Sequence, residues 1–304
     1  MEMTALINKM FIFVVLMVIG YGAARLKAVG PEFAKDASKL VINVFMIASI
    51  IKPVLNSQFQ LSLKELASVM FLVCLAMALC WVIALAAALP MKKLGDNKST
   101  FELLAGATNI IFIGLPVVET LYGSKAVFYC ALTCMPFNAL FYTVGVWRMQ
   151  EGKGKVRLKD IFSTPLIATI VGLIIFLSSP TIPPVLEELC ATLAGATLPL
   201  SMVVIGASLG SVNLAAAFKR KELYYMCFVR LLLAPLLIWL VLGFFTADEM
   251  LRVTTTLLCA CPTAVMVTVL AIQYGKDPVF SSQGVLLSTV LSLFTLPLLV
   301  AILV

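Results

Sequence analysis

Two prolines, each inside a long apolar stretch, mark the residues best suited to chemistry in this chain. Pro116 ends residues 108–116, which read TNIIFIGLP, and Pro262 lies in residues 259–263, which read CACPT. Proline lacks the backbone N–H and its ring collides with the carbonyl four residues earlier, so we expect each helix to break or kink there. The amides after such a break lack intrahelical acceptors and together carry about half a positive charge. They predict an anion site built from backbone N–H groups.

Neutral polar side chains near the prolines extend this predicted site. Asn109 and Thr263 can donate hydrogen bonds, and Gly114 permits close approach of another backbone. Asn138 and Tyr142 are four residues apart and therefore share a helix face. The predicted binding residues are Thr108, Asn109, Gly114, Pro116, Val117, Asn138, Tyr142, Cys261, Pro262 and Thr263. The alternative stays open that the polar groups only bond neighbouring helices and the prolines are packing kinks.

Two charged residues near these stretches are candidates for coupling. Glu119 lies one turn after Pro116 and is either a proton carrier or an exposed carboxylate at a helix end. Arg230 lies inside the apolar stretch 223–245, where it either balances a buried acid or bound anion or extends to the lipid head groups, the reading we favour. Because the chain has no histidine, no proton relay is predicted.

Composition excludes a soluble domain. Of the 304 residues 62% are hydrophobic and 12% charged, with mean hydropathy +1.09, whereas a soluble domain has about 25% charged residues. Windows of about 20 apolar residues, the length that crosses a bilayer, predict an all-α polytopic membrane protein with ten helices at 4–24, 33–55, 66–89, 100–122, 126–147, 165–179, 185–209, 223–245, 249–274 and 279–302. The eight cysteines lie within or beside these windows, so we expect packing residues, with no metal and no cofactor.

Charge placement predicts the orientation. Sixteen of the 22 lysine and arginine residues lie in or beside the connections after odd-numbered helices, five lie on the other side, and Arg230 lies within a helix. Cytoplasmic connections carry the positive excess, so both termini are expected outside the cytoplasm of the cell (inner) membrane. The net charge of +7 therefore reports orientation and not nucleic-acid binding. Residues 148–160 form the predicted linker between repeats 1–147 and 161–304, and five helices per half make the repeats inverted.

Three motifs in this order resemble the auxin efflux carrier family of prokaryotic transporters. They are Asn109-x-x-Phe112-x-Gly114-Leu115-Pro116, then Leu198-Pro199-Leu200 with Ile205-Gly206-Ala207-Ser208-Leu209, then Cys261-Pro262-Thr263-Ala264 with Leu270-Ala271-x-x-Tyr274-Gly275. The resemblance spans the chain and implies two inverted five-helix repeats, a scaffold of helices 1, 2, 6 and 7, and a transport domain of helices 3–5 and 8–10. Within that domain it implies broken helices 4 and 9 that cross. The chain departs from the family where Met46-Ile47-Ala48-Ser49 replaces a common helix 2 proline.

The expected function is secondary transport of a small organic anion, a mono- or dicarboxylate, by elevator-like alternating access at this crossing. One alternative is a sodium-coupled organic anion symporter resembling the bile acid symporter group. A membrane sensor without transport is another, and a membrane enzyme is disfavoured because no nucleophile with a base or paired carboxylates is evident. The expected partners are the anion, the lipid bilayer and a second copy of the chain in a homodimer, and not nucleic acid.

Overall fold

Helices make up the regular structure, as the apolar windows predicted. The computed structural model describes residues 3–30, 32–55, 61–151, 164–178, 182–210 and 218–303, and within them the only β pairing is one isolated antiparallel bridge between Thr108 and Thr263. Six helical runs in this part are long and apolar enough to cross a membrane, and two apolar helices are shorter. The all-α prediction is confirmed, while the ten-helix inverted repeat stays a prediction.

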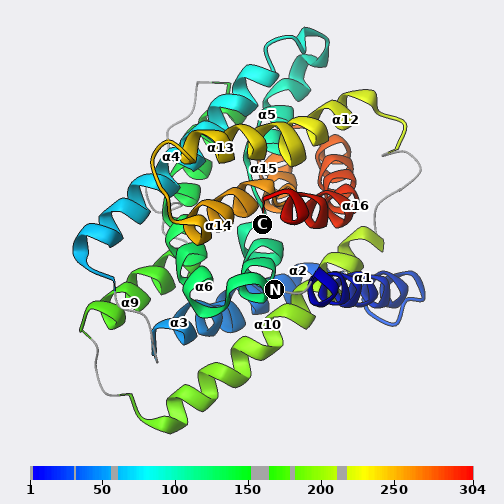
Figure 1. Ribbon diagram of the computed structural model, residues 1–304. Coiled ribbons are helices and arrows are strands. Elements are labelled where there is room, and N and C mark those ends of the chain that lie inside the picture. Colours follow the sequence, from blue (N-terminus) through cyan, green and yellow to red (C-terminus); the bar gives the residue numbers. More distant parts are fainter. Residues whose placement is uncertain are drawn as a thin grey trace.

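Helices occupy the predicted windows, although several windows are divided into shorter helices and one helix runs from one window into the next. Their bounds are α1 Met3–Arg25, α2 Phe33–Leu40, α3 Met46–Leu55, α4 Leu63–Ala87, α5 Lys98–Gly106, α6 Leu115–Leu140, α7 Val146–Met149, α9 Thr164–Ser178, α10 Pro184–Gly210, α12 Lys221–Phe228, α13 Ala234–Leu242, α14 Glu249–Ala260, α15 Met266–Gln273 and α16 Pro278–Leu303 (Figure 1). Five-residue π-helices join several of them, at Val41–Phe45, Ile110–Gly114, Phe141–Gly145 and Val229–Leu233, and a 3₁₀ helix, Lys92–Asn97, precedes α5. Gly123, with φ +66°, interrupts α6 between two predicted windows, a conformation that favours glycine.

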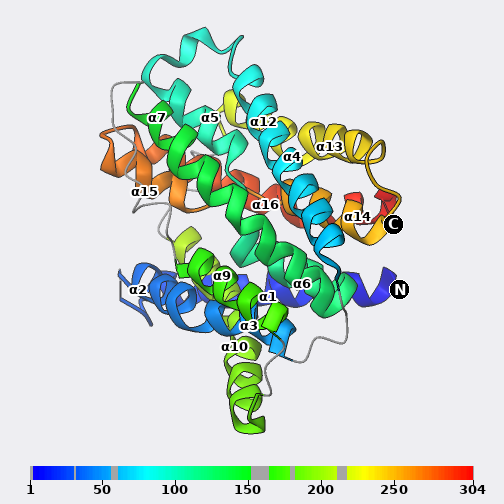
Figure 2. The same cartoon turned by 90° about the vertical axis from the view of Figure 1, so that its left-hand side faces the viewer.

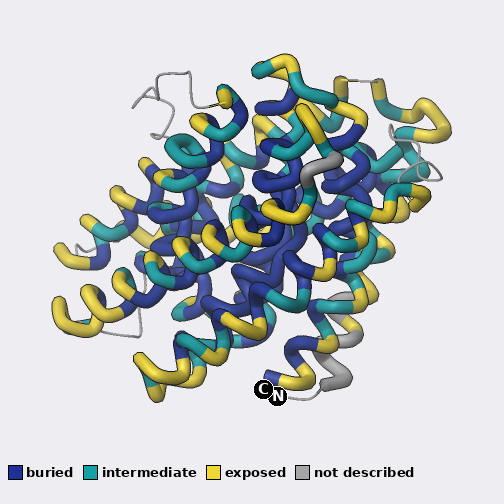
Figure 3. The backbone as a smooth tube through the Cα atoms, turned by 90° about the horizontal axis from the view of Figure 1, so that it is seen from above, coloured by how far each residue is buried: buried dark blue, intermediate teal, exposed yellow. Residues whose placement is uncertain are grey.

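Two groups of helices lie one above the other (Figures 1 and 2). In the first group α1 packs along α10, α10 packs on α3, and α3 packs on α9. The second group contains α4, α5, α7 and α12 to α16, and α6 contacts α9 and α3 as well as α4 and α14. Figure 3 shows the buried residues concentrated inside the molecule and the exposed ones at its periphery.

Glycines allow the backbones of α1 and α10 to touch. A Cβ atom on Gly20 would lie 2.0 Å from the carbonyl oxygen of Val203, and one on Gly206 would lie 1.9 Å from that of Met17. Both distances are far inside van der Waals contact, so only glycine fits at either position. Reciprocal contacts of this kind, in which small residues let helices approach, are typical of packing within membranes.

Large apolar side chains also cover the outside of the molecule. Phe11, Leu240 and Phe294 are 66%, 53% and 72% exposed. Exposed apolar surface on this scale would be unfavourable in water but matches the hydrocarbon of a bilayer. The pattern of exposure therefore agrees with a chain that lies in a membrane.

Candidate functional site

Two helices unwind inside the second group, and their unwound segments cross. α5 ends at Gly106 and the next helical turn begins at Ile110, while α14 ends at Ala260 and α15 begins at Met266. The segments pair through their backbones: the Asn109 N–H donates to the Pro262 carbonyl at 2.8 Å, and the Ala264 N–H donates to the Ala107 carbonyl at 2.9 Å. The crossing thus satisfies backbone groups that unwinding would otherwise leave unpaired in an apolar interior.

The first break does not lie at its proline, contrary to prediction. Pro116 lies within a continuous helix that starts as the π-helix Ile110–Gly114 and continues as α6. The π turn, closed by the Gly114 N–H donating to the Asn109 carbonyl at 3.1 Å, changes the hydrogen-bond register just before Pro116 and accommodates its ring without a break. The free helix N-terminus consequently lies at Ile110 and Ile111 and not after Pro116.

The second break contains Pro262, as predicted, but the amides assigned to the anion have protein partners. The Thr263 N–H donates to Ser288 Oγ at 3.1 Å, and the Ala264 N–H is used in the crossing. The N-terminal end that can face a ligand is therefore at Val265 and Met266, where α15 begins. Both corrections move the predicted anion-binding amides while keeping two helix N-termini at the crossing.

Two threonines fasten the crossing reciprocally. Thr108 Oγ1 donates to the Leu258 carbonyl at 2.5 Å, near the end of α14, and Thr263 Oγ1 donates to the Leu104 carbonyl at 2.7 Å, near the end of α5. Both side chains are buried. Each unwound segment therefore satisfies a carbonyl in the last turn of the other helix, and these threonines act in the crossing itself.

We expect Thr263→Val to lower the free energy of unfolding by about 1–3 kcal/mol, because a buried Leu104 carbonyl loses its donor at nearly constant volume. Thermal unfolding of the purified protein measures this. Thr192→Val is the matched control, since the exposed Thr192 hydroxyl bonds only within its own helix, to Glu188. Equal melting temperatures for the two variants would contradict the prediction.

A cavity of about 150 Å³ lies beside the crossing. Its lining residues come from both helix N-termini, from α10 and from α16, and they are Asn109, Ile205, Ser208, Leu209, Val265, Thr268, Ser282, Val285, Leu286 and Thr289. None of these side chains is charged, several carry hydroxyl groups, and the others are apolar. A cavity of this size accepts a molecule about as large as benzene.

Asn109 connects the crossing to the cavity. Its Oδ1 atom accepts a hydrogen bond from the Phe112 N–H at 3.2 Å and so caps the half-helix that begins at Ile110. Its Nδ2 atom has no hydrogen-bond partner among the described residues. Asn109 therefore offers one amide donor next to the free N–H groups of the helix it caps.

The other predicted binding residues lie away from the cavity lining. A Cβ atom on Gly114 would meet Leu258 Cδ2 at 2.8 Å, so this glycine allows its helix to approach α14. Val117 is buried, and the Asn138 Nδ2 atom donates to the Cys134 carbonyl at 2.8 Å within its own helix. Tyr142 is half-buried in the π-helix Phe141–Gly145.

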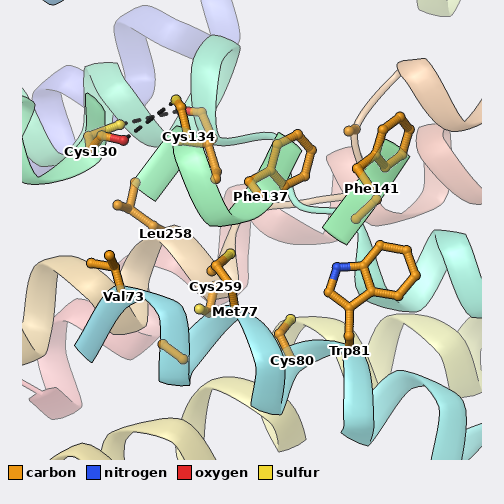
Figure 4. Packing of buried hydrophobic residues seen from close by; sticks show 14 of the residues in the cluster. Val73, Met77, Cys80, Trp81, Cys130, Cys134, Phe137, Phe141, Leu258 and Cys259 are labelled. Atoms are coloured by element: carbon orange, nitrogen blue, oxygen red, sulfur yellow. Dashed lines mark hydrogen bonds between the residues drawn. The ribbon is translucent and has the colours of Figure 1, made fainter. Parts of the chain in front are cut away.

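The cysteines lie mostly in the apolar interior. All eight are free, and Cys80, Cys130, Cys134, Cys227, Cys259 and Cys261 are buried. Figure 4 shows Cys80 and Cys259 with Met77 among buried side chains, and Cys134 next to Cys130, whose carbonyl accepts from the Cys134 thiol at 3.6 Å. Their surroundings agree with the predicted packing role.

We expected Arg230 to extend to the lipid head groups, but it lies fully buried at the crossing. Its Nε atom donates to the Cys261 carbonyl at 3.0 Å, and its Nη1 atom donates to the carbonyls of Ala105 at 3.0 Å and Gly106 at 3.3 Å. The same Nη1 lies 3.1 Å from Cys80 Sγ. The guanidinium therefore binds the C-terminal ends of α5 and α14. Its positive charge interacts favourably there with the negative ends of both helix dipoles.

Glu119, the other coupling candidate, is exposed and faces Lys52 of α3 at 3.8 Å.

Sequence reasoning missed the cavity residues of α10, α15 and α16. Ser208 belonged to a motif already singled out by resemblance, so a signal existed for it. Val265, Thr268 and Ser282 became recognisable only once the crossing placed them beside Asn109.

Comparison with known proteins relates the chain to membrane transporters. Residues 5–155 and 147–300 match the model of a family described as membrane transport protein. A protein of Methanothermobacter thermautotrophicus, described as an uncharacterized transporter, is 29% identical over 293 residues, which are 93% of this chain and 94% of that protein.

Proposed function

The chain belongs to the membrane transport protein family, the auxin efflux carrier family that its motifs resemble, and from this membership we propose that it is a secondary transporter of a small organic anion. The observation that carries the proposal is the convergence of two helix N-termini and the free amide of Asn109 on one small cavity. Each N-terminus contributes about half a positive charge and donors aimed at a ligand. No acidic side chain among the lining residues opposes an anion.

The cavity lining favours a small carboxylate with a short carbon skeleton. The N–H groups and Asn109 supply donors for a carboxylate, and Ile205, Leu209 and Val285 supply apolar contacts for the carbon atoms. Transport sites at broken helices combine these two features, with positive helix ends facing the anionic group. A monocarboxylate or small dicarboxylate is the proposed substrate.

Alternating access would follow from movement between the two helix groups. The cavity lies between α10, in the first group, and the crossing, in the second. We assign α1, α2, α3, α9 and α10 to a scaffold and the remaining helices to a transport domain that slides along α10 like an elevator, in a ten-helix inverted repeat. We propose that both termini lie outside the cytoplasm and that the protein forms a homodimer in the cell membrane. The ion pair between Lys276 and Glu151 supports this orientation, because it joins two connections that are both assigned to the cytoplasmic side.

Asn109→Asp tests the site. Aspartate keeps the helix cap but removes the donor and adds a negative charge beside the anion, so uptake into proteoliposomes should fall at least about tenfold. The melting temperature, measured on the same preparation, separates loss of the site from loss of the fold. The substrate to use is the organic acid, from a panel of small mono- and dicarboxylates, that most raises the melting temperature.

Asn138→Ala is the control, because its amide bonds within its own helix and does not line the cavity. Its uptake should remain near that of the wild type. If Asn109→Asp transports as well as this control, the anion binds elsewhere.

A further inference from the structure

Carbonyl oxygens from two helix ends converge on one arginine at the crossing. The last carbonyls of a helix lack intrahelical donors and together carry about half a negative charge. The oxygens of Ala105, Gly106 and Cys261 all lie within 3.3 Å of Arg230 nitrogen atoms. In transporters with discontinuous helices, unwound carbonyls and helix C-termini of this kind coordinate the coupling cation. In this protein a guanidinium already occupies them.

We infer that Arg230 is a built-in substitute for a coupling cation, so that the protein needs no sodium ion at the crossing. This inference rests on the proposed transport function. Arginine does not lose its proton in proteins, and this side chain is 0% exposed. Its charge therefore remains at the crossing through an entire cycle, whereas a bound sodium ion would be released.

The local structure holds Arg230 in this position. It belongs to the π-helix Val229–Leu233 between α12 and α13, and π turns occur frequently at functional sites. A sodium ion would need the same oxygens and would lie beside a permanent positive charge. The geometry therefore disfavours the sodium-coupled alternative that the sequence left open.

The charge balance at the crossing supports the same conclusion. Two helix C-termini contribute about one negative charge in total, which the single charge of Arg230 neutralises. The two helix N-termini at the cavity are then left with a net positive potential for the anion. One fixed cation thus supplies the neutralisation that a transported cation would otherwise supply.

Melting of the purified full-length protein in sodium chloride and in choline chloride, at equal ionic strength, tests the inference without any substrate. We expect the wild-type melting temperature to be the same in both salts and radioactive sodium to show no saturable binding. A sodium-specific rise in the wild-type melting temperature would overturn the inference.

Arg230→Ala vacates the carbonyl oxygens and supplies the positive result. In choline chloride we expect its melting temperature to fall by roughly 5 °C or more, and sodium chloride should restore part of the loss. Arg252→Ala is the matched control, because Arg252 Nε also donates to a carbonyl, that of Trp239 at 2.9 Å, away from the crossing. The Arg252→Ala protein should lose stability, and its melting temperature should not respond to sodium. An Arg230→Ala protein that responds to sodium no more than this control overturns the inference.

Arg230→Lys provides a second test of the inference if Arg230→Ala does not fold. Lysine retains the charge with fewer fixed donors, so we expect a smaller loss of stability and again no response to sodium; a sodium response in this variant counts against the inference. The two proposals also fail separately. Uptake of an organic anion that stops when choline replaces sodium overturns this inference alone, whereas the absence of anion transport refutes only the proposed function.

Discussion

Gly206→Ala should strongly destabilise the protein, although it adds a single methyl group. The new Cβ atom would lie 1.9 Å from the Met17 carbonyl oxygen of α1, and a backbone atom, unlike a flexible side chain, cannot move aside without displacing its helix. Overpacking usually costs about 1–3 kcal/mol, and contact with backbone places this variant at the upper end. We expect the melting temperature of the purified protein to fall by roughly 5 °C.

Gly195→Ala is the control within the same helix. A Cβ atom there meets nothing within 4 Å, so alanine should leave stability unchanged or raise it slightly through its helix propensity. A melting temperature for Gly206→Ala within a degree or two of that control would show that α1 and α10 are not in backbone contact.

Arg148→Met should have a comparably large effect through charge. Arg148 binds Glu102 in a bidentate pair, with Nε–Oε2 and Nη2–Oε1 distances of 2.5 and 2.6 Å, and the Glu102 side chain is only 2% exposed. Removing the arginine leaves a buried carboxylate without a partner, which typically costs about 3–5 kcal/mol. We expect about 3 kcal/mol from denaturant unfolding, because Arg148 itself is 33% exposed.

A second substitution separates the charge from the packing. The double variant Glu102→Gln/Arg148→Met removes the uncompensated charge and should recover part of the lost stability. Lys35→Met removes one member of an exposed pair, Lys35–Glu32, and should change stability little. Unfolding of Arg148→Met at the same denaturant concentration as Lys35→Met would refute a stabilising role for the buried pair.

The helices could be predicted from the sequence because a bilayer sets their length. About 20 apolar residues must follow one another to cross it, and the polar residues or Gly123 that separate such runs stand out in the sequence. The second break was also visible, since Pro262 lies in it and proline changes backbone hydrogen bonding wherever it occurs. These are local properties, and each can be read in a window of a few residues.

The position of the first break could not be predicted in the same way. It lies at residues 107–109 because their backbone pairs with residues 262–264, and a partner so distant in the sequence leaves no local signal. Arg230 illustrates the same limit. From its neighbours it resembles an arginine that extends to the head groups, and only the meeting of α5 and α14 provides the carbonyls that hold it.

The crossing also constrains the order in which the protein can be made. The Asn109 N–H and the Ala107 carbonyl find their partners only in Pro262 and Ala264. A ribosome adding about 5–20 residues per second reaches those partners on the order of ten to thirty seconds later. Because unpaired backbone groups are excluded from lipid, the first broken helix must stay hydrated or sheltered by the insertion machinery until the second arrives. The two halves of the chain therefore complete one another during biosynthesis.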